Sequence, residues 1–257
     1  MPDSPFDLTG QRALVTGSTR GIGGAIATGL ARAGATVVLH GRDLDRVQAA
    51  RATLRAEVPS ADLHVCAFDM ADHEAITEQA GRLEAELGGI DVLVNNAGIQ
   101  FRAPLTEFPL DAWNQVISVN LTSCFVLAQA LARGMLDRGR GKIINVCSLQ
   151  TQLVRASTSA YAAAKSGLGS LTRTMCAEWA EGGIQANGLA PGYIGTDLNT
   201  VLVEDEEFSA WVRGRTPARR WGTPEDLAGP AVWLASPASD FVNGQVIYVD
   251  GGITAVL

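Results

Sequence analysis

Short apolar runs rich in β-branched residues alternate along the chain with long Ala-rich segments whose apolar positions repeat at helical spacing. The first run, RALVT at 12–16, leads into a helical pattern that extends from about 21 to 33. This succession is typical of βαβ units, in which helices join parallel strands. Six further runs predict strands, at 35–40, 63–68, 90–95, 141–147, 184–189 and 244–249.

The predicted strands are almost continuously apolar, which is typical of parallel strands that are covered on both faces. We therefore predict an α/β protein of the Rossmann type, with a doubly wound seven-stranded parallel sheet and helices on both faces. No linker rich in Pro, Gly and Ser, no internal repeat and no low-complexity segment interrupts the chain. Residues 1–257 are accordingly predicted to form a single domain.

The least regular stretch of the sequence lies at about 191–224. It contains the helix-like patch NTVLVEDEEFSAWVRGR at 199–215 between turn-rich flanks. Long irregular segments in small domains often cover a binding site, so we predict a substrate lid here. An ordinary surface excursion is the alternative.

A glycine-rich turn, Thr16–Gly23, separates the first strand from the first helix. Glycines at such a turn let the backbone approach a pyrophosphate, which then binds to the free N–H groups at the helix N-terminus. A second turn, Asn95–Gly98, ends the fourth predicted strand. The two turns together predict a dinucleotide site at one edge of the sheet.

The end of the second strand indicates which nicotinamide cofactor binds. An acidic residue there accepts hydrogen bonds from the ribose hydroxyls of NAD, but this chain has His40, Gly41 and Arg42. Arg42 and Arg20 are suited to hold a 2′-phosphate, so we predict NADP(H). The alternative is that both arginines are solvated surface charges. Asp69, after the third strand, is equally consistent with binding adenine and with capping the next helix.

Composition narrows the classes of partner. The 257 residues are 47% hydrophobic and 18% charged with a net charge of −7, which argues against nucleic acid and anionic membranes as the main partner. No run reaches the roughly 18 uninterrupted apolar residues of a membrane span, and no leader-like segment precedes the domain. The four cysteines lack CxxC spacing and the three histidines lack metal-ligand spacing. We expect a cytoplasmic protein with reduced thiols and no metal.

Three residues suggest acid–base chemistry. Tyr161 and Lys165 are four residues apart in a helical pattern and so share one face. A nearby ammonium and an oxidised nicotinamide would both favour the phenolate, whose formation otherwise requires a pH near 10. Ser148, at the end of the fifth strand, is placed to donate a hydrogen bond to a reacting carbonyl or alcohol oxygen.

These motifs occur together and in one order along the chain. The Thr-Gly-x-x-x-Gly-x-Gly turn, Asn-Asn-Ala-Gly, the serine, the Tyr-x-x-x-Lys pair and Ala190–Gly192 resemble the short-chain dehydrogenase/reductase family from end to end. The resemblance implies that Tyr161 is the general acid/base, Lys165 its electrostatic partner and Ser148 the donor to the substrate oxygen. It also implies the sheet order 3-2-1-4-5-6-7 and a homotetramer.

Further site residues follow from the resemblance. Asn120 matches the helix asparagine that holds a water for proton relay, although spacing alone indicates an ordinary polar helix residue. Ile194 and Thr196 match the residues that hold the carboxamide and diphosphate ends of the cofactor. The residues expected to contact the cofactor are Gly17, Thr19, Arg20, Gly21, Ile22, Gly23, Arg42, Asp69, Met70, Asn96, Ala97, Gly98, Tyr161, Lys165, Pro191, Gly192, Ile194 and Thr196.

The expected substrate is a six-carbon keto acid, best matched by 5-keto-D-gluconate, which would be reduced to D-gluconate and formed again in reverse. Several loop stretches, including 202–206, 219–222 and 239–244, resemble family members that act on such compounds. A buried carboxylate needs a cation. Arg102 follows the Asn-Asn-Ala-Gly turn and Arg155 lies between Ser148 and Tyr161, so each is placed where the far end of a bound substrate could reach. Gln150 and Tyr193 are expected to bind the hydroxyls, and Ser148 the reacting oxygen.

The sequence also leaves alternatives. Phe101, Ala160 and Gly195 depart from residues common in some members of the family. A 3-oxoacyl thioester reductase or a reductase of another polyol or keto sugar would share the same catalytic parts. A nicotinamide-binding regulator without turnover would need the turn but not the acid–base set. The apolar helices near 111–136 and 159–181 suggest a subunit interface.

Overall fold

Seven parallel strands form one sheet in the computed structural model, which describes residues 4–256. Their order, β3-β2-β1-β4-β5-β6-β7, confirms the predicted topology, and each strand begins and ends within two residues of its prediction. The strands are β1 (Arg12–Val15), β2 (Thr36–Gly41), β3 (Leu63–Ala67), β4 (Val92–Asn95), β5 (Gly141–Val146), β6 (Ile184–Pro191) and β7 (Val246–Val249).

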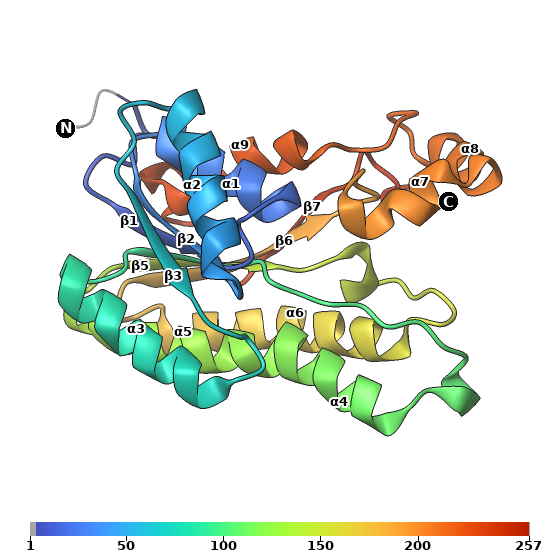
Figure 1. Cartoon of the computed structure of the whole chain (residues 1–257), viewed down its shortest axis with the longest axis horizontal. Helices are drawn as coiled ribbons and strands as arrows, with labels where there is room; N and C mark the ends of the chain where they lie inside the picture. Colours follow the sequence, from blue (N-terminus) through green and yellow to red (C-terminus); the bar gives the residue numbers. More distant parts are fainter. Residues whose placement is uncertain (1–3, 257) are drawn as a thin grey trace.

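Helices cover both faces of the sheet (Figure 1). One face carries α1, α2 and α9, and the other carries α3, α5 and α6, with α4 leading into α5. The short helices α7 and α8 lie beyond the sheet, near the C-terminus. The helices are α1 (Gly21–Arg32), α2 (Leu44–Glu57), α3 (His73–Leu87), α4 (Leu110–Ile117), α5 (Ser123–Asp137), α6 (Ser159–Trp179), α7 (Thr200–Glu204), α8 (Glu206–Arg215) and α9 (Ala228–Ala235).

The two layers of helices explain why the strands are apolar at successive positions. In β1, Leu14 faces the cluster built with α3 and α5, whereas its neighbour Val15 faces the cluster built with α1 and α9. Both side chains are fully buried. A residue on either face of such a strand is removed from water, so the alternation seen in half-exposed strands is absent.

A π-helical turn, Ser118–Thr122, joins α4 and α5 into one helical segment, Leu110–Asp137. By length and composition alone this segment is apolar enough to cross a membrane. However, Leu127, Leu131 and Met135 are fully buried in the cluster between α3 and the sheet. This is the packing of a core helix.

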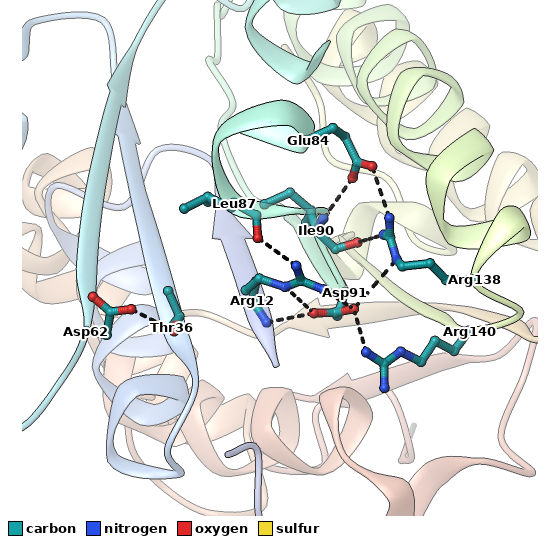
Figure 2. A network of polar contacts seen from close by, with 9 residues as sticks. All are labelled: Arg12, Thr36, Asp62, Glu84, Leu87, Ile90, Asp91, Arg138 and Arg140. Carbon is teal, nitrogen blue, oxygen red and sulfur yellow. Dashed lines mark hydrogen bonds and ion pairs between the residues drawn. The ribbon is translucent and has the colours of Figure 1, made fainter. Parts of the chain in front are cut away.

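An ionic network closes the end of the sheet at which β1 and β4 begin (Figure 2). The carboxylate of Asp91 is 1% exposed and accepts hydrogen bonds from the Arg12 main chain (3.0 Å) and from Arg12 Nε (2.8 Å). Arg138 and Arg140 approach the same carboxylate at 3.9 and 3.5 Å. Glu84 pairs with Arg138 at 3.0 Å and accepts from the Ile90 main chain, which ties the end of α3 to β4.

Asp91→Asn should destabilise the protein by about 3–5 kcal/mol, because it leaves the surrounding guanidinium groups without their buried counter-charge. Denaturant unfolding measures the loss. Glu57→Gln is the matched control, since Glu57 pairs with Arg32 at a site where both side chains are about half exposed or more. That change should cost less than about 1 kcal/mol. Similar losses in the two variants would show that the Asp91 network does not stabilise the fold.

Candidate active site

The glycine turn after β1 and the loop after β4 hold each other in place. Gly17 has a φ of +63°, and a Cβ at Gly23 would lie 2.4 Å from both the Gly17 carbonyl oxygen and Asn96 Nδ2. Asn96 Nδ2 donates to the carbonyl oxygens of Thr16 (2.8 Å) and Gly17 (3.1 Å). The turn therefore requires glycine at these two positions, and it leaves the N-terminus of α1 open for an anion.

His40 supports the same turn from β2. Its Nδ1 accepts a hydrogen bond from the Gly17 main-chain N–H (3.1 Å), so Nε2 carries the proton and donates to the Phe68 carbonyl oxygen (3.1 Å). The ring is 1% exposed, and burial lowers the pKa of His40 from 6.5 to about 4. His40 is thus a satisfied polar residue of the core.

Because the pKa of His40 is lower in the folded state, this residue should destabilise the fold progressively as the pH falls from 6.5 towards 4. Over this window only the unfolded chain binds the proton, which amounts to about 3 kcal/mol. Unfolding of the wild type and of His40→Gln should be measured between pH 8 and pH 4. The variant should show a flatter profile across the window, and identical slopes would contradict the account.

A cavity of about 1820 Å³ opens at the carboxyl edge of the sheet. Every residue that the sequence predicted for cofactor, substrate or catalysis lines it, with the exception of Asn120. The lining comes from loops after β1, β2, β3, β4, β5 and β6, which the parallel topology brings to one edge. This is where ligands of open α/β sheets bind.

One end of the cavity is basic. Arg20 and Arg42 both line it, but Arg20 Nη1 also pairs with Asp197 at 2.8 Å. Within residues 4–256, Arg42 makes no ion pair. Arg46, in the first turn of α2, adds a third guanidinium to this end, and the sequence interpretation missed it. The sequence could have indicated Arg46 by its position, four residues after Arg42 in the turn that leads from β2 to α2.

Asp69 lines the cavity without capping a helix. Its carboxylate accepts from the Ala71 main chain (2.9 Å), whereas the N-cap of α3 is Asp72, which accepts from Ala75 (3.0 Å). Of the two interpretations of Asp69, capping is therefore wrong. Met70 is buried beside it and also lines the cavity.

The segment after β6 forms the opposite wall. The Gly192 main-chain N–H donates to Val249 (3.0 Å), and a Cβ at Gly192 would lie 2.6 Å from the Asp250 backbone. Ile194 is 3% exposed and its carbonyl oxygen accepts from Asn199 Nδ2 (2.9 Å). Pro191 and Thr196 complete this wall.

Ser148, Tyr161 and Lys165 all line the cavity. The turn that begins at Ser148 is bound to α6, because the Ser148 main chain donates to Thr151 Oγ1 (3.2 Å), which in turn donates to the Lys165 carbonyl oxygen (3.3 Å). Lys165 Nζ donates to the Val146 carbonyl oxygen (2.6 Å) and lies 5.7 Å from the centroid of the Tyr161 ring. The serine, phenol and ammonium groups therefore share one rigid frame.

Asn120 lies in the π-helical turn, fully buried, and its side chain is already engaged. Its Oδ1 accepts from the Ile99 main-chain N–H and its Nδ2 donates to the Ile99 carbonyl oxygen, both at 2.8 Å. The side chain thus fixes the loop that follows Gly98, a role that spacing alone did not indicate. The expectation that Asn120 holds a relay water stays a prediction.

The other end of the cavity carries two more arginines. Burial, together with the neighbouring charge of Arg155, lowers the pKa of Arg102. Burial raises the pKa of the Tyr193 phenol, and the charges of Arg155 and Arg102 oppose that shift. Gln150 also lines this end, where its Oε1 accepts from the Thr158 hydroxyl (2.6 Å). Among the described residues neither arginine pairs with a carboxylate, and two such cations close together favour an anionic ligand.

The helix-like patch at 199–215 contains two helices, α7 and α8. The chain breaks at Asp205, whose carboxylate accepts from the Phe208 main chain (3.0 Å) and so caps α8. Phe208, Trp211 and Trp221 gather around Tyr193 at ring-centroid distances of 5.5–5.8 Å. Phe208 and Trp211 line the cavity, and the sequence interpretation missed both, although their spacing in α8 places them on one face.

The dimensions and chemistry of the cavity fit a dinucleotide with a small substrate beside it. Gly17, Gly23 and Gly192 pack so closely on neighbouring residues that a Cβ there would clash, and all three line the cavity, where a pyrophosphate can approach their backbone. The basic end suits a ribose phosphate, and the Ser148 hydroxyl and Tyr161 phenol suit polarisation of one substrate oxygen.

Comparisons with known proteins agree with this geometry. The family model described as Enoyl-(Acyl carrier protein) reductase matches residues 17–254. The chain is 50% identical to gluconate 5-dehydrogenase of Gluconobacter oxydans over 98% of both chains, and 47% identical to 5-keto-D-gluconate 5-reductase of Escherichia coli over 96% of this chain and 97% of the other. A gluconate 5-dehydrogenase from Burkholderia cenocepacia, solved in complex with NADP and tartrate, is 50% identical with a TM-score of 0.95 over 98% of both chains.

Proposed function

Because this chain belongs to the short-chain dehydrogenase/reductase family, we propose that it interconverts a secondary alcohol and a ketone with NADP(H), and that the pair is D-gluconate and 5-keto-D-gluconate. The observation that carries the choice of substrate is the pair Arg102 and Arg155, which share one end of the cavity that contains Ser148 and Tyr161. A substrate without an anionic group gives these two cations no counter-charge.

The cofactor is held along the whole edge of the sheet. The turn Gly17–Gly23 would hold its pyrophosphate, and Arg42, with Arg20 and Arg46, would hold its 2′-phosphate. Asp69 and Met70 contact the adenine, and the 191–196 segment contacts the nicotinamide end. Three similar proteins of known structure contain bound NADP, which supports this assignment. When bound, the nicotinamide supplies or accepts the hydride.

The side chains of this protein orient the substrate and move its proton. Ser148 Oγ donates to the reacting oxygen, and Tyr161 gives its phenolic proton to that oxygen during reduction and takes it back during oxidation. Lys165, fixed by Val146, places a positive charge beside the phenol and binds the ribose of the cofactor. Asn120 acts as a positioning residue, because its side chain holds the loop at Ile99.

The substrate lies with its carboxylate between Arg102 and Arg155, and Gln150 and Tyr193 bind the hydroxyls in between. Arg102→Ala and Arg155→Ala should each raise KM for 5-keto-D-gluconate about 10–100-fold, since each removes a charge-assisted hydrogen bond. KM for the uncharged amide of the same keto acid should change less than about threefold. Equal effects on acid and amide would contradict a carboxylate site.

We also propose the wider organisation of the protein. The chain forms one domain, and the segment 191–224 acts as a lid over the substrate end of the cavity.

The exposed apolar residues Phe125 and Leu136 on α5 support burial of this face in a homotetramer. The reduced cysteines, three of them buried, support a cytoplasmic location. Light scattering tests the assembly, and a monomer in dilute buffer would contradict it.

A further inference from the structure

The guanidinium group of Arg155 rests on the face of an aromatic ring from the lid. Its central carbon lies 4.5 Å from the centroid of Phe208. The main chain at Arg155 is held separately, because the Thr158 hydroxyl donates to its carbonyl oxygen (2.8 Å). Across residues 4–256, no carboxylate pairs with the Arg155 side chain. The ring of Phe208 is therefore the contact that sets where the guanidinium lies.

Phe208 is itself held on several sides. Its main-chain N–H donates to the capping residue Asp205 (3.0 Å). Its ring stacks on Trp211, with centroids 5.5 Å apart and planes at 28°, and meets the edge of Tyr193 at 5.5 Å and 78°. A side chain constrained in this way presents a fixed surface to Arg155.

Stacking on a ring leaves the guanidinium ready to bind a carboxylate. The interaction uses the face of the planar group, whereas its N–H donors point outward in the plane. The ring of Phe208 also counteracts the repulsion between Arg102 and Arg155. The two arginines are close enough for the charge of Arg155 to contribute to the lowered pKa of Arg102. Without the ring, Arg155 would be free to turn away from Arg102 into water.

We propose that Phe208 is a positioning residue that holds Arg155 in place for the carboxylate of the substrate, and that the lid thereby contributes to selection of acidic substrates. The inference rests on the proposed function, since it takes Arg155 as a carboxylate ligand. It assigns to α8 a specificity role that requires no direct contact between Phe208 and the substrate.

The test is a double-mutant cycle on KM. Phe208→Leu should raise KM for 5-keto-D-gluconate about 3–10-fold, with kcat and KM for the uncharged amide changed less than twofold, because leucine can still pack against Tyr193 and Trp211 but offers no ring face to Arg155. Phe208→Tyr, which keeps an aromatic face, should restore the wild-type KM. In the Arg155→Ala background, Phe208→Leu should add no further increase.

Two results would overturn this inference while leaving the proposed carboxylate site intact. One is an equal rise in KM for acid and amide in Phe208→Leu, which indicates a general packing role. The other is that Phe208→Leu raises KM for the keto acid in the Arg155→Ala background by the same factor as in the wild type. If Arg155→Ala itself leaves KM for the keto acid unchanged, the carboxylate site and the inference built on it both fail.

Discussion

Tyr161→Phe is expected to lower kcat by about 10²–10⁴-fold, because the variant cannot give a proton to the oxygen that forms the alcohol. The change removes one hydroxyl from a side chain whose position is set by α6, and Lys165 stays bound to the Val146 carbonyl oxygen. The glycine turn and the basic end of the cavity are untouched. NADPH binding, measured by fluorescence titration, should therefore keep its Kd within about twofold while turnover is lost.

The matched control is Tyr248→Phe. Tyr248 lies in β7 and is not among the residues that line the cavity, so the same loss of a hydroxyl should leave kcat within about twofold. Near-normal turnover in Tyr161→Phe would exclude this tyrosine as the acid. A parallel loss of NADPH binding would indicate that the phenol acts through the structure of the site.

Arg42→Asp should reverse the preference for cofactor. The wild type should use NADPH more efficiently than NADH, and the variant should lose about 10²–10³-fold in kcat/KM for NADPH, since a charge-assisted bond to the 2′-phosphate is replaced by repulsion. Activity with NADH should be kept or should rise, because an acidic residue after β2 accepts hydrogen bonds from ribose hydroxyls. Arg42 is exposed and makes no ion pair within the described chain, so stability should not change.

Arg51→Asp provides the control for charge. Arg51 is an exposed residue of α2 that does not line the cavity, so this variant has the same change in net charge without a change in the site. Its ratio of NADPH to NADH efficiency should match that of the wild type. A wild type that uses NADH more efficiently than NADPH would show that the basic end of the cavity does not select the 2′-phosphate.

The sequence predicts the sheet and most of the cavity because both depend on local patterns. Strands covered on both faces are apolar at successive positions such as Leu14 and Val15, and a parallel sheet then brings the loops that follow its strands to one edge. Gly17 and Gly23 lie where the turn leaves no room for a side chain, and Asn96 donates the hydrogen bonds that hold this turn. Their residue types therefore indicate their roles. These residues can therefore be assigned to one edge of the sheet from their order along the chain.

What the sequence does not reveal are contacts between segments that are distant along the chain. The helix-like patch at 199–215 does not indicate where a helix ends, and the cap that Asp205 makes to Phe208 shows that a new helix begins there. The contact of Arg155 with Phe208 joins the loop after β5 to α8, and the pair of Arg20 with Asp197 joins the glycine turn to the segment after β6. No periodicity encodes these pairs. Asn120 illustrates the same limit, because its partner Ile99 lies 21 residues away.

The central claim is that the cavity binds NADP(H) beside a keto acid. Its most direct test is the initial rate of NADPH oxidation by the purified protein with 5-keto-D-gluconate, its uncharged amide, other keto sugars and a 3-oxoacyl thioester. The account predicts the highest kcat/KM for 5-keto-D-gluconate, with D-gluconate as the product, and lower values for every other compound. A higher kcat/KM for the thioester or for an uncharged keto sugar would contradict it, and no oxidation with any of them would favour a nicotinamide-binding regulator.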